Sequence, residues 1–167
     1  MEEKTQRALS WILPILKARD IPYQISGGFA AKIYGSVRPL NDIDIDIPDA
    51  RFPEIIDEVM PYVTYGPGRF KDGKWDCEQI TLDYHGQEID ICGADTCVIT
   101  SKDRTRTIAL TTNFAAAQLH IINGIELSVV SPHDLIAYKK ELDGEHQQID
   151  IDAVENYIRN NSVTPQR

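Results

Sequence analysis

The stretch NDIDIDIP, residues 41–48, carries the strongest signal in the sequence. In an extended strand, side chains alternate between the two faces, so Asp42, Asp44 and Asp46 share one face and three isoleucines share the other. Successive carboxylates then stand roughly 6.6 Å apart, and at an effective dielectric of about 20 each adjacent pair repels by about 2.5 kcal/mol. Water at a sheet edge would dilute this repulsion, and a divalent cation would reverse its sign. Because aspartate also disfavours strands, the pattern favours a metal-binding strand over a solvated one.

Length and composition predict an ordinary globular protein. The 167 residues suit a single domain, with a core over about 20–155, and 42% of the residues are hydrophobic. No apolar run approaches the ~18–20 residues that would span a bilayer, so no membrane partner is expected. The start, MEEKTQRALS, lacks the basic and then apolar layout of a secretory signal. A cytoplasmic location is therefore expected.

The net charge narrows the kinds of binding partner to expect, and the cysteines bear on whether disulfides or a zinc site are present. A net charge of −9 repels nucleic-acid phosphates and attracts a cationic acceptor. Cys77, Cys92 and Cys97 are an odd number and contain no CxxC pair. This pattern favours free reduced thiols over a disulfide framework or a zinc site.

Hydrophobic periodicity and turn signals predict the other elements. Helices are expected over residues 3–19, 28–35, 53–63, 131–142 and 149–161. Strands are expected over residues 21–26, 77–84, 87–93, 117–123 and 125–130, the last four forming hairpins at His85-Gly86 and Asn123-Gly124. The Gly-rich segment 66–75 is interpreted as a basic loop. This order predicts an α+β fold in which helices flank a mixed sheet.

Finer predictions concern the terminal helices. The apolar face of the first helix comprises Leu9, Ile12, Leu13 and Leu16, and Pro14 is expected to kink or break that helix. The last helix is expected to bury Ile149, Ala153, Tyr157 and Ile158. Asp150 and Asp152 are interpreted as residues that cap or charge its N-terminal turn.

Two features near each other in the sequence predict a site. Gly27-Gly28 lies where a strand passes into a helix, and glycine lets backbone N–H groups approach an anion closely. Oxygen ligands from one or two carboxylates, with phosphates of the substrate, are what Mg²⁺ prefers. A third carboxylate is expected from another strand, either Asp90 or, as its substitute, Glu88. The metal pair is Asp42 with Asp44 or, two residues along, Asp44 with Asp46.

The longer stretch ISGGFAAKIYGSVRPLNDIDIDIP, residues 25–48, resembles the signature of the DNA polymerase β-type nucleotidyltransferase superfamily. That signature is a hydrophobic residue, Gly-Gly or Gly-Ser, a spacer, and then an acidic-hydrophobic-acidic triplet. Arg38 and the later segment SPHDLIAYKKEL are most similar to the small bacterial branch. This branch contains the aminoglycoside nucleotidyltransferases and the minimal nucleotidyltransferases of toxin–antitoxin pairs.

The resemblance implies a fold like the polymerase β palm and a role for each matching residue. Asp42 and Asp44 would bind two Mg²⁺ ions, and Asp90 would bind the catalytic metal or take the proton of the acceptor hydroxyl. The residues implied in binding nucleotide phosphates are Ser26, Gly27, Gly28, Arg38, Lys139 and Lys140.

The implied activity is Mg²⁺-dependent transfer of a nucleoside monophosphate from an NTP, with ATP preferred, to a hydroxyl, releasing pyrophosphate. The acceptor would be an aminoglycoside-like small molecule or a protein, and the partners to consider are a second copy or a toxin subunit. The alternative is a binding or regulatory module of the same fold with little turnover. Nucleotide addition to nucleic-acid ends is disfavoured by the charge.

Overall fold

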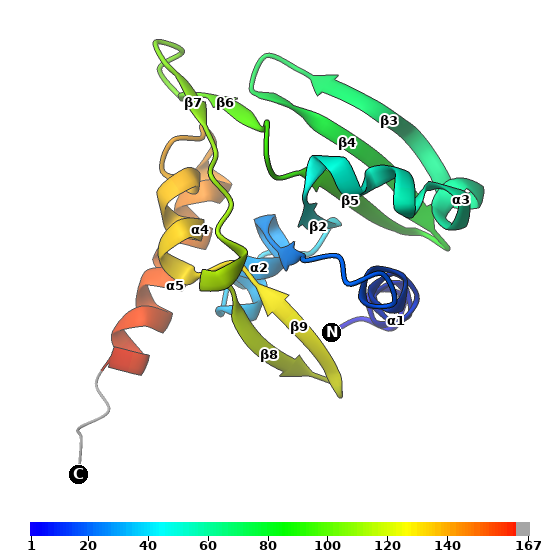
Figure 1. Cartoon of the computed structure of the whole chain (residues 1–167). Helices are drawn as coiled ribbons and strands as arrows, with labels where there is room; N and C mark the ends of the chain where they lie inside the picture. Colours follow the sequence, from blue (N-terminus) through cyan, green and yellow to red (C-terminus); the bar gives the residue numbers. More distant parts are fainter. Residues whose placement is uncertain (163–167) are drawn as a thin grey trace.

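A computed structural model describes residues 1–162 and shows helices arranged around one large curled sheet (Figure 1). The helices are α1 (Glu3–Lys17), α2 (Gly27–Ile33), α3 (Ile56–Val59), α4 (Pro132–Lys139) and α5 (Glu145–Ser162), with 3₁₀ turns η1 (Asp49–Glu54), η2 (Met60–Tyr62) and η3 (Phe114–Ala116). The first five strands are β1 (Gln24–Ile25), β2 (Asp42–Ile47), β3 (Val63–Lys71), β4 (Trp75–Tyr84) and β5 (Gln87–Gly93). The others are β6 (Val98–Thr100), β7 (Thr107–Ala109), β8 (Gln118–Ile122) and β9 (Ile125–Val129).

The aspartate strand β2 lies in the middle of this sheet. The strand order is β7-β6-β4-β5-β2-β1-β9-β8, and β3 pairs with the other edge of β4. Strand β2 runs parallel to β5 and antiparallel to β1, so the sheet is mixed and the predicted α+β class is confirmed. The parallel register places Asp44 beside Asp90, which aligns the two carboxylate-bearing strands.

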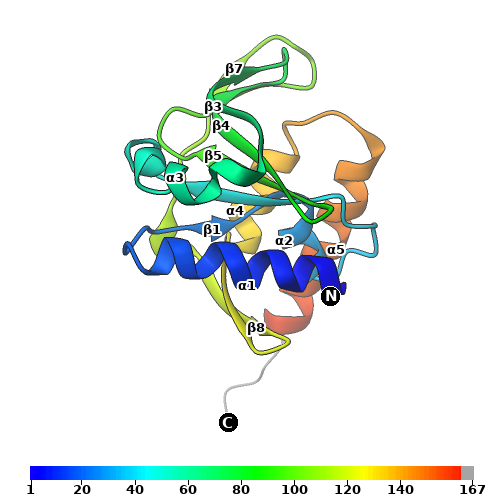
Figure 2. The ribbon, with the colours of Figure 1, turned by 90° about the vertical axis from the view of Figure 1, so that its right-hand side faces the viewer.

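The isoleucines of β2 anchor the hydrophobic core. All three are fully buried and belong to the same core cluster as the apolar face of α1. Figure 2 shows α1 crossing the sheet as one continuous helix, and the four apolar residues predicted for its inner face are buried. Pro14 lies within α1 and does not end it. No helix within residues 1–162 is long and apolar enough to span a bilayer.

Both predicted hairpins form where the sequence placed them. Strands β4 and β5 are joined at His85-Gly86, and β8 and β9 at Asn123-Gly124. All four turn residues have positive φ, which is the backbone geometry that a two-residue turn between right-twisted strands requires. Local turn chemistry was therefore sufficient to set these registers.

Residues 53–71 differ from the prediction. The helix expected over 53–63 is instead a series of short turns, η1, α3 and η2. Pro53 and Pro61 each remove a backbone donor, so no continuous helix of three turns forms. Most of the expected basic loop belongs to strand β3, which pairs with β4 with register shifts between Val63 and Gly68. Because β3 is an edge strand, it tolerates proline and irregular pairing.

The last helix was predicted too short, and its predicted inner face is confirmed only in part: Tyr157 and Ile158 pack against the core. Helix α5 begins at Glu145, and Ile149 is 46% exposed, whereas Ile151 and Val154 are buried. Asp150 and Asp152 both lie beyond the first turn of α5, so their interpretation as residues of the N-terminal turn was wrong. Asp150 is fully buried, and Asp152 is exposed.

Candidate active site

Three carboxylates from two adjacent parallel strands meet at one point. Asp42 and Asp44 project from β2 and Asp90 projects from β5, and one oxygen of each lies within 4.8 Å of the others. Glu88, the substitute considered for Asp90, pairs in register with Asp42 and is exposed. The three aspartates, here called the aspartate triad, are close enough to share a cation.

Electrostatics in the triad favour either protonation or a bound cation. Burial raises the pKa of Asp44 well above its usual value, and the charges of Asp42 and Asp90 raise it further. Burial also raises the pKa of Asp90. A hard divalent cation with oxygen ligands would relieve this repulsion, so the donor set fits Mg²⁺.

Asp90 is held in place by two side chains of β4 that the sequence analysis did not single out. Thr81 Oγ1 donates a hydrogen bond of 2.6 Å to Asp90 Oδ1, and Gln79 Nε2 donates one of 3.0 Å to the same oxygen. The signal for these residues was present in the hairpin. A two-residue turn at 85–86 pairs Tyr84 with Gln87, and counting back from that pair places Thr81 opposite Asp90.

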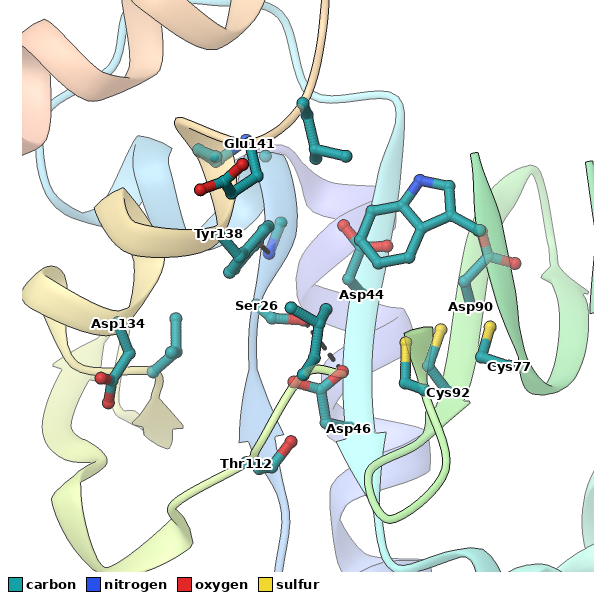
Figure 3. Close-up of a pocket in the computed structure, with 18 of the residues that line it drawn as sticks. Ser26, Asp44, Asp46, Cys77, Asp90, Cys92, Thr112, Asp134, Tyr138 and Glu141 are labelled. Carbon is teal, nitrogen blue, oxygen red and sulfur yellow. Dashed lines mark hydrogen bonds between the residues drawn. The ribbon is translucent and has the colours of Figure 1, made fainter. Parts of the chain in front are cut away.

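Asp46 lies outside the triad, although it projects from the same face of β2. Its carboxylate accepts hydrogen bonds from Gln24 Nε2 (2.9 Å) and Ser26 Oγ (3.1 Å), the second of which is drawn in Figure 3. Burial raises the pKa of Asp46 to about 6, and these hydrogen bonds oppose that effect. The geometry thus groups Asp42 with Asp44, and leaves Asp46 with polar partners of its own.

The glycines predicted to bind phosphate differ in how much space lies beside them, and Gly27 has very little. Gly27 has φ +60°, and a Cβ built on it would lie 1.6 Å from Asp44 Oδ2, so only glycine fits beneath this carboxylate. Its N–H donates to the hydroxyl of Tyr138 over 2.8 Å, a partner on α4 that was not predicted. Gly28, by contrast, has open space around its Cβ position. Of this segment, Gly28 has the most room for a ligand.

A buried carboxylate on α5 organises the cationic side of the site. Asp150 on α5 is fully buried and accepts a hydrogen bond from Ser36 Oγ (2.7 Å). It also pairs with Arg38 Nη1 (2.5 Å) and Lys139 Nζ (3.0 Å), which are two of the predicted phosphate-binding residues. Lys139 is itself buried and donates to Gln147 Oε1. Asp150 therefore fixes both cations beside the cavity.

The other predicted lysine lies elsewhere. Lys140 pairs with Glu155 on the exposed surface of α5, at 3.1 Å, and does not line the cavity. Successive residues on a helix point about 100° apart, so the neighbour of an inward-facing Lys139 turns away.

A cavity of about 770 Å³ opens over the triad. The sheet, α4 and the segment after β7 surround it, and Figure 3 shows Asp44, Asp46 and Asp90 on the sheet side facing Tyr138 of α4. Seven acidic residues line it: Asp42, Asp44, Asp46, Asp72, Asp90, Asp134 and Glu141. Three basic residues line it: Arg38, Lys74 and Lys139. The cavity is therefore predominantly anionic.

The three cysteines, which are dispersed in the sequence, converge on the wall of this cavity. Cys77 of β4, Cys92 of β5 and Cys97 before β6 all line it, and Figure 3 shows Cys77 and Cys92 on the same side of the cavity. All three are free thiols, as predicted. Hydrogen bonds from the thiols of Cys92 and Cys97 lower the pKa of Cys77.

Comparison with known proteins gives matches in structure but not in sequence. No protein-family model and no curated protein sequence matches the chain. A candidate nucleotidyltransferase from Thermotoga maritima superposes with a TM-score of 0.69 over 96% of each chain, at 17% identity. The lincosamide antibiotic adenylyltransferase LnuA, bound to lincomycin, gives 0.60 over 93% of this chain and 99% of its own, at 12% identity.

A third structure has a comparable TM-score and sequence identity. ANT(2″)-Ia, in complex with adenylyl-2″-tobramycin, gives a TM-score of 0.61 over 95% of this chain and 92% of its own, at 17% identity. At such identities the likeness establishes the fold: the chain has the nucleotidyltransferase fold that the resemblance of residues 25–48 implies.

Proposed function

Starting from that fold, we propose that the protein is a Mg²⁺-dependent nucleotidyltransferase that moves a nucleoside monophosphate from an NTP to an acceptor hydroxyl and releases pyrophosphate. The observation that carries the proposal is the aspartate triad at the base of the cavity, with its three oxygens within 4.8 Å. Two adjacent parallel strands fix these carboxylates, so the site is preformed.

Asp42, Asp44 and Asp90 are the residues that would hold Mg²⁺. When bound, Mg²⁺ neutralises phosphate charge and orients the attacking and leaving oxygens of an in-line displacement. Asp90 is also the proposed base for the acceptor hydroxyl. Burial raises its pKa, which makes it a better proton acceptor than an exposed carboxylate, and Thr81 and Gln79 fix its orientation.

The phosphates of the NTP are proposed to lie between Gly28 and the cations that Asp150 anchors. Arg38 and Lys139 line the cavity and provide positive charge on the side facing the triad. Phosphoryl-type transfer requires mainly positioning and neutralisation of charge, and fixed cations supply both. Ser26 and Gly27 shape this segment, and their polar groups already have partners in Asp46 and Tyr138.

We propose ATP as the donor and a cationic, hydroxyl-bearing small molecule as the acceptor. Two structures of the same fold are an adenylyltransferase for lincosamides and a protein bound to adenylyl-tobramycin, which supports an adenylyl donor. The excess of acidic over basic residues around the cavity supports a cationic acceptor, because opposite charge attracts and retains it.

The test is pyrophosphate release from each of the four NTPs, with Mg²⁺ or with EDTA. The acceptor panel holds an aminoglycoside, a lincosamide and a hydroxyl-bearing protein. We expect release that requires Mg²⁺, is fastest with ATP and increases with one cationic acceptor. Asp90→Asn, purified identically, controls for contaminating enzymes.

Two results would count against the proposal. Equal release from Asp90→Asn would place the activity elsewhere. Binding of Mg²⁺–ATP without turnover on any acceptor would instead support the alternative, a binding module of the same fold.

A further inference from the structure

The cysteine cluster contains one pair whose backbone geometry suits a covalent bond. Strands β4 and β6 are antiparallel, with Trp75 opposite Ile99 and Asp76 opposite Val98. Continued by one position beyond the last paired residues, this register would bring Cys77 opposite Cys97, whose thiol is a hydrogen-bond partner of Cys77. Directly opposed residues have Cα atoms about 4.5–5.5 Å apart, which lies within the span of about 4.4–6.8 Å that a disulfide bridges.

Cys92 is placed less favourably for bonding to Cys77. On β5 it stands opposite Gln79, so it is a diagonal neighbour of Cys77. Diagonal neighbours lie about 7–8 Å apart, beyond what a disulfide spans without backbone movement. The thiols are not arranged as a metal site either. Within residues 1–162 the aspartate triad is the only group of three or more such ligands with all its atoms within 4.8 Å.

We propose that Cys77 and Cys97 form a peroxide-reactive dithiol in the wall of the cavity. Both side chains line the cavity, so a small oxidant can reach them although neither is exposed on the outer surface. The lowered pKa of Cys77 favours the thiolate, which is the form that attacks peroxide. Cys97 lies across the strand pair and would act as the resolving thiol.

The chemistry balances with hydrogen peroxide as the oxidant. The Cys77 thiolate attacks one oxygen, the O–O bond breaks, and sulfenic acid and hydroxide form. The Cys97 sulfur then attacks the sulfenic sulfur, the S–O bond breaks, and the oxygen leaves as water with the proton of the Cys97 thiol. In total, two thiols lose two electrons and two protons, and one peroxide becomes two waters.

Hydrogen bonds connect this pair to the proposed catalytic carboxylate. When protonated, the Cys77 thiol donates to Gln79 Oε1 over 3.9 Å, and Gln79 Nε2 in turn donates to Asp90 Oδ1. A disulfide draws the Cys77 sulfur toward Cys97, so its contact with Gln79 changes, and with it the hold of Gln79 on Asp90. This consequence rests on the proposed function, whereas the disulfide itself does not.

Mass spectrometry of the oxidised protein tests the pair directly. The reduced full-length protein is treated with hydrogen peroxide, alkylated and digested after glutamate and aspartate, because residues 75–101 contain no lysine or arginine. Cuts after Glu78, Glu88 and Asp95 then separate the three cysteines. We expect a Cys77–Cys97 linkage that dithiothreitol reverses, with Cys92 alkylated.

Two matched variants control the experiment. Cys92→Ser should give the same linkage, and Cys97→Ser should give none, with near-UV circular dichroism showing that each variant is folded. A Cys77–Cys92 linkage, alkylation of all three thiols after peroxide, or an unchanged product in folded Cys97→Ser would overturn the proposal.

Turnover is measured separately on the same samples. If the reduced protein releases pyrophosphate, oxidation should lower its rate about tenfold, the smaller of the effects seen when an outer partner of a metal ligand is lost. Dithiothreitol should restore the rate, and Cys97→Ser should resist peroxide. An oxidised protein with an unchanged rate would overturn the link to Asp90. No turnover in the reduced protein would count against the proposed function. It would not affect the mass-spectrometric test of the Cys77–Cys97 linkage.

Discussion

Acidic side chains stand at two places in the molecule, and their surroundings differ in charge. In the aspartate triad, Asp42, Asp44 and Asp90 face one another and raise the pKa of Asp44. Around Asp150, a single carboxylate is matched by a hydroxyl, a guanidinium and an ammonium. Within residues 1–162 no cationic side chain forms an ion pair with the triad, whereas two cations pair with Asp150.

This difference separates a binding site from a structural one. A buried carboxylate with its own cations needs nothing from outside, and removing it would leave those cations without a counter-charge. A cluster of carboxylates that has no ion-pair partners costs free energy, because the like charges repel one another. A bound divalent ion would offset this repulsion. The predictions below test this contrast, from the largest expected effect to the smallest.

Asp44→Asn should reduce turnover by about 10³-fold. A bound metal supplies several kcal/mol of charge stabilisation in the transition state, and about 1.4 kcal/mol corresponds to a factor of ten. The measurement is pyrophosphate release under saturating Mg²⁺–ATP. Asp46→Asn is the matched control, because Asp46 shares the strand and face but hydrogen-bonds to Gln24 and Ser26. Equal losses in both variants would contradict the grouping of Asp42 with Asp44.

Asp150→Ala should lower the free energy of unfolding by about 3–5 kcal/mol, because it leaves the buried Lys139 ammonium without its charge partner. Urea denaturation followed by circular dichroism measures this. Asp152→Ala, on the exposed surface of the same helix, should change stability by less than about 0.5 kcal/mol. A loss below about 1 kcal/mol in Asp150→Ala would mean that the network contributes little.

Gly27→Ala should cost about 2 kcal/mol of stability and displace Asp44. Its φ of +60° strains any L side chain, and the new methyl group would overlap Asp44 Oδ2. Gly28→Ala, one residue along in α2, meets open space and should stabilise the helix by about 0.5–1 kcal/mol. Chemical denaturation of both variants checks the opposite signs. Two changes of the same sign would show that the turn is not constrained by the carboxylate.

Asp46 should make the metal-free protein less stable as pH rises. Its pKa is raised to about 6 in the folded state, so between about pH 4 and pH 6 the folded chain retains a proton that the unfolded chain has lost. The free energy of unfolding in EDTA should therefore fall across this window in wild type relative to Asp46→Asn. The expected difference is on the order of 1 kcal/mol, after allowance for solvent screening. Parallel pH profiles for the two proteins would contradict it.

Much of the sheet could be predicted from short stretches of sequence. Alternation fixed the faces of β2, and the His85-Gly86 and Asn123-Gly124 turns fixed both hairpins, because such patterns act over a few residues. Strand β3 was missed, since its glycines and proline are typical of loops and only an edge position tolerates them in a strand. The cytoplasmic location and the single-domain boundaries stay predictions.

The site residues that lie on one strand could be predicted from the sequence. The contacts between segments that are distant in the sequence could not. Asp42 and Asp44 are two residues apart, and Asp90 follows from strand alternation on β5. The partners of Asp150 come from positions 36, 38 and 139, so its burial depends on the packing of three segments. Tyr138 and the cysteine cluster were hidden for the same reason, because no local pattern reports which side chains meet across the fold.

The position of Asp150 on the last helix has a consequence for biosynthesis. While the ribosome is still adding residues to α5, β2 and β5 are already outside and free to pair, but Arg38 and Lys139 have no counter-ion. The nascent chain therefore contains all three carboxylates of the aspartate triad before Asp150 can anchor the two cations. A polypeptide that stalls before codon 150 would carry the carboxylates of the site without the anchored cations opposite them.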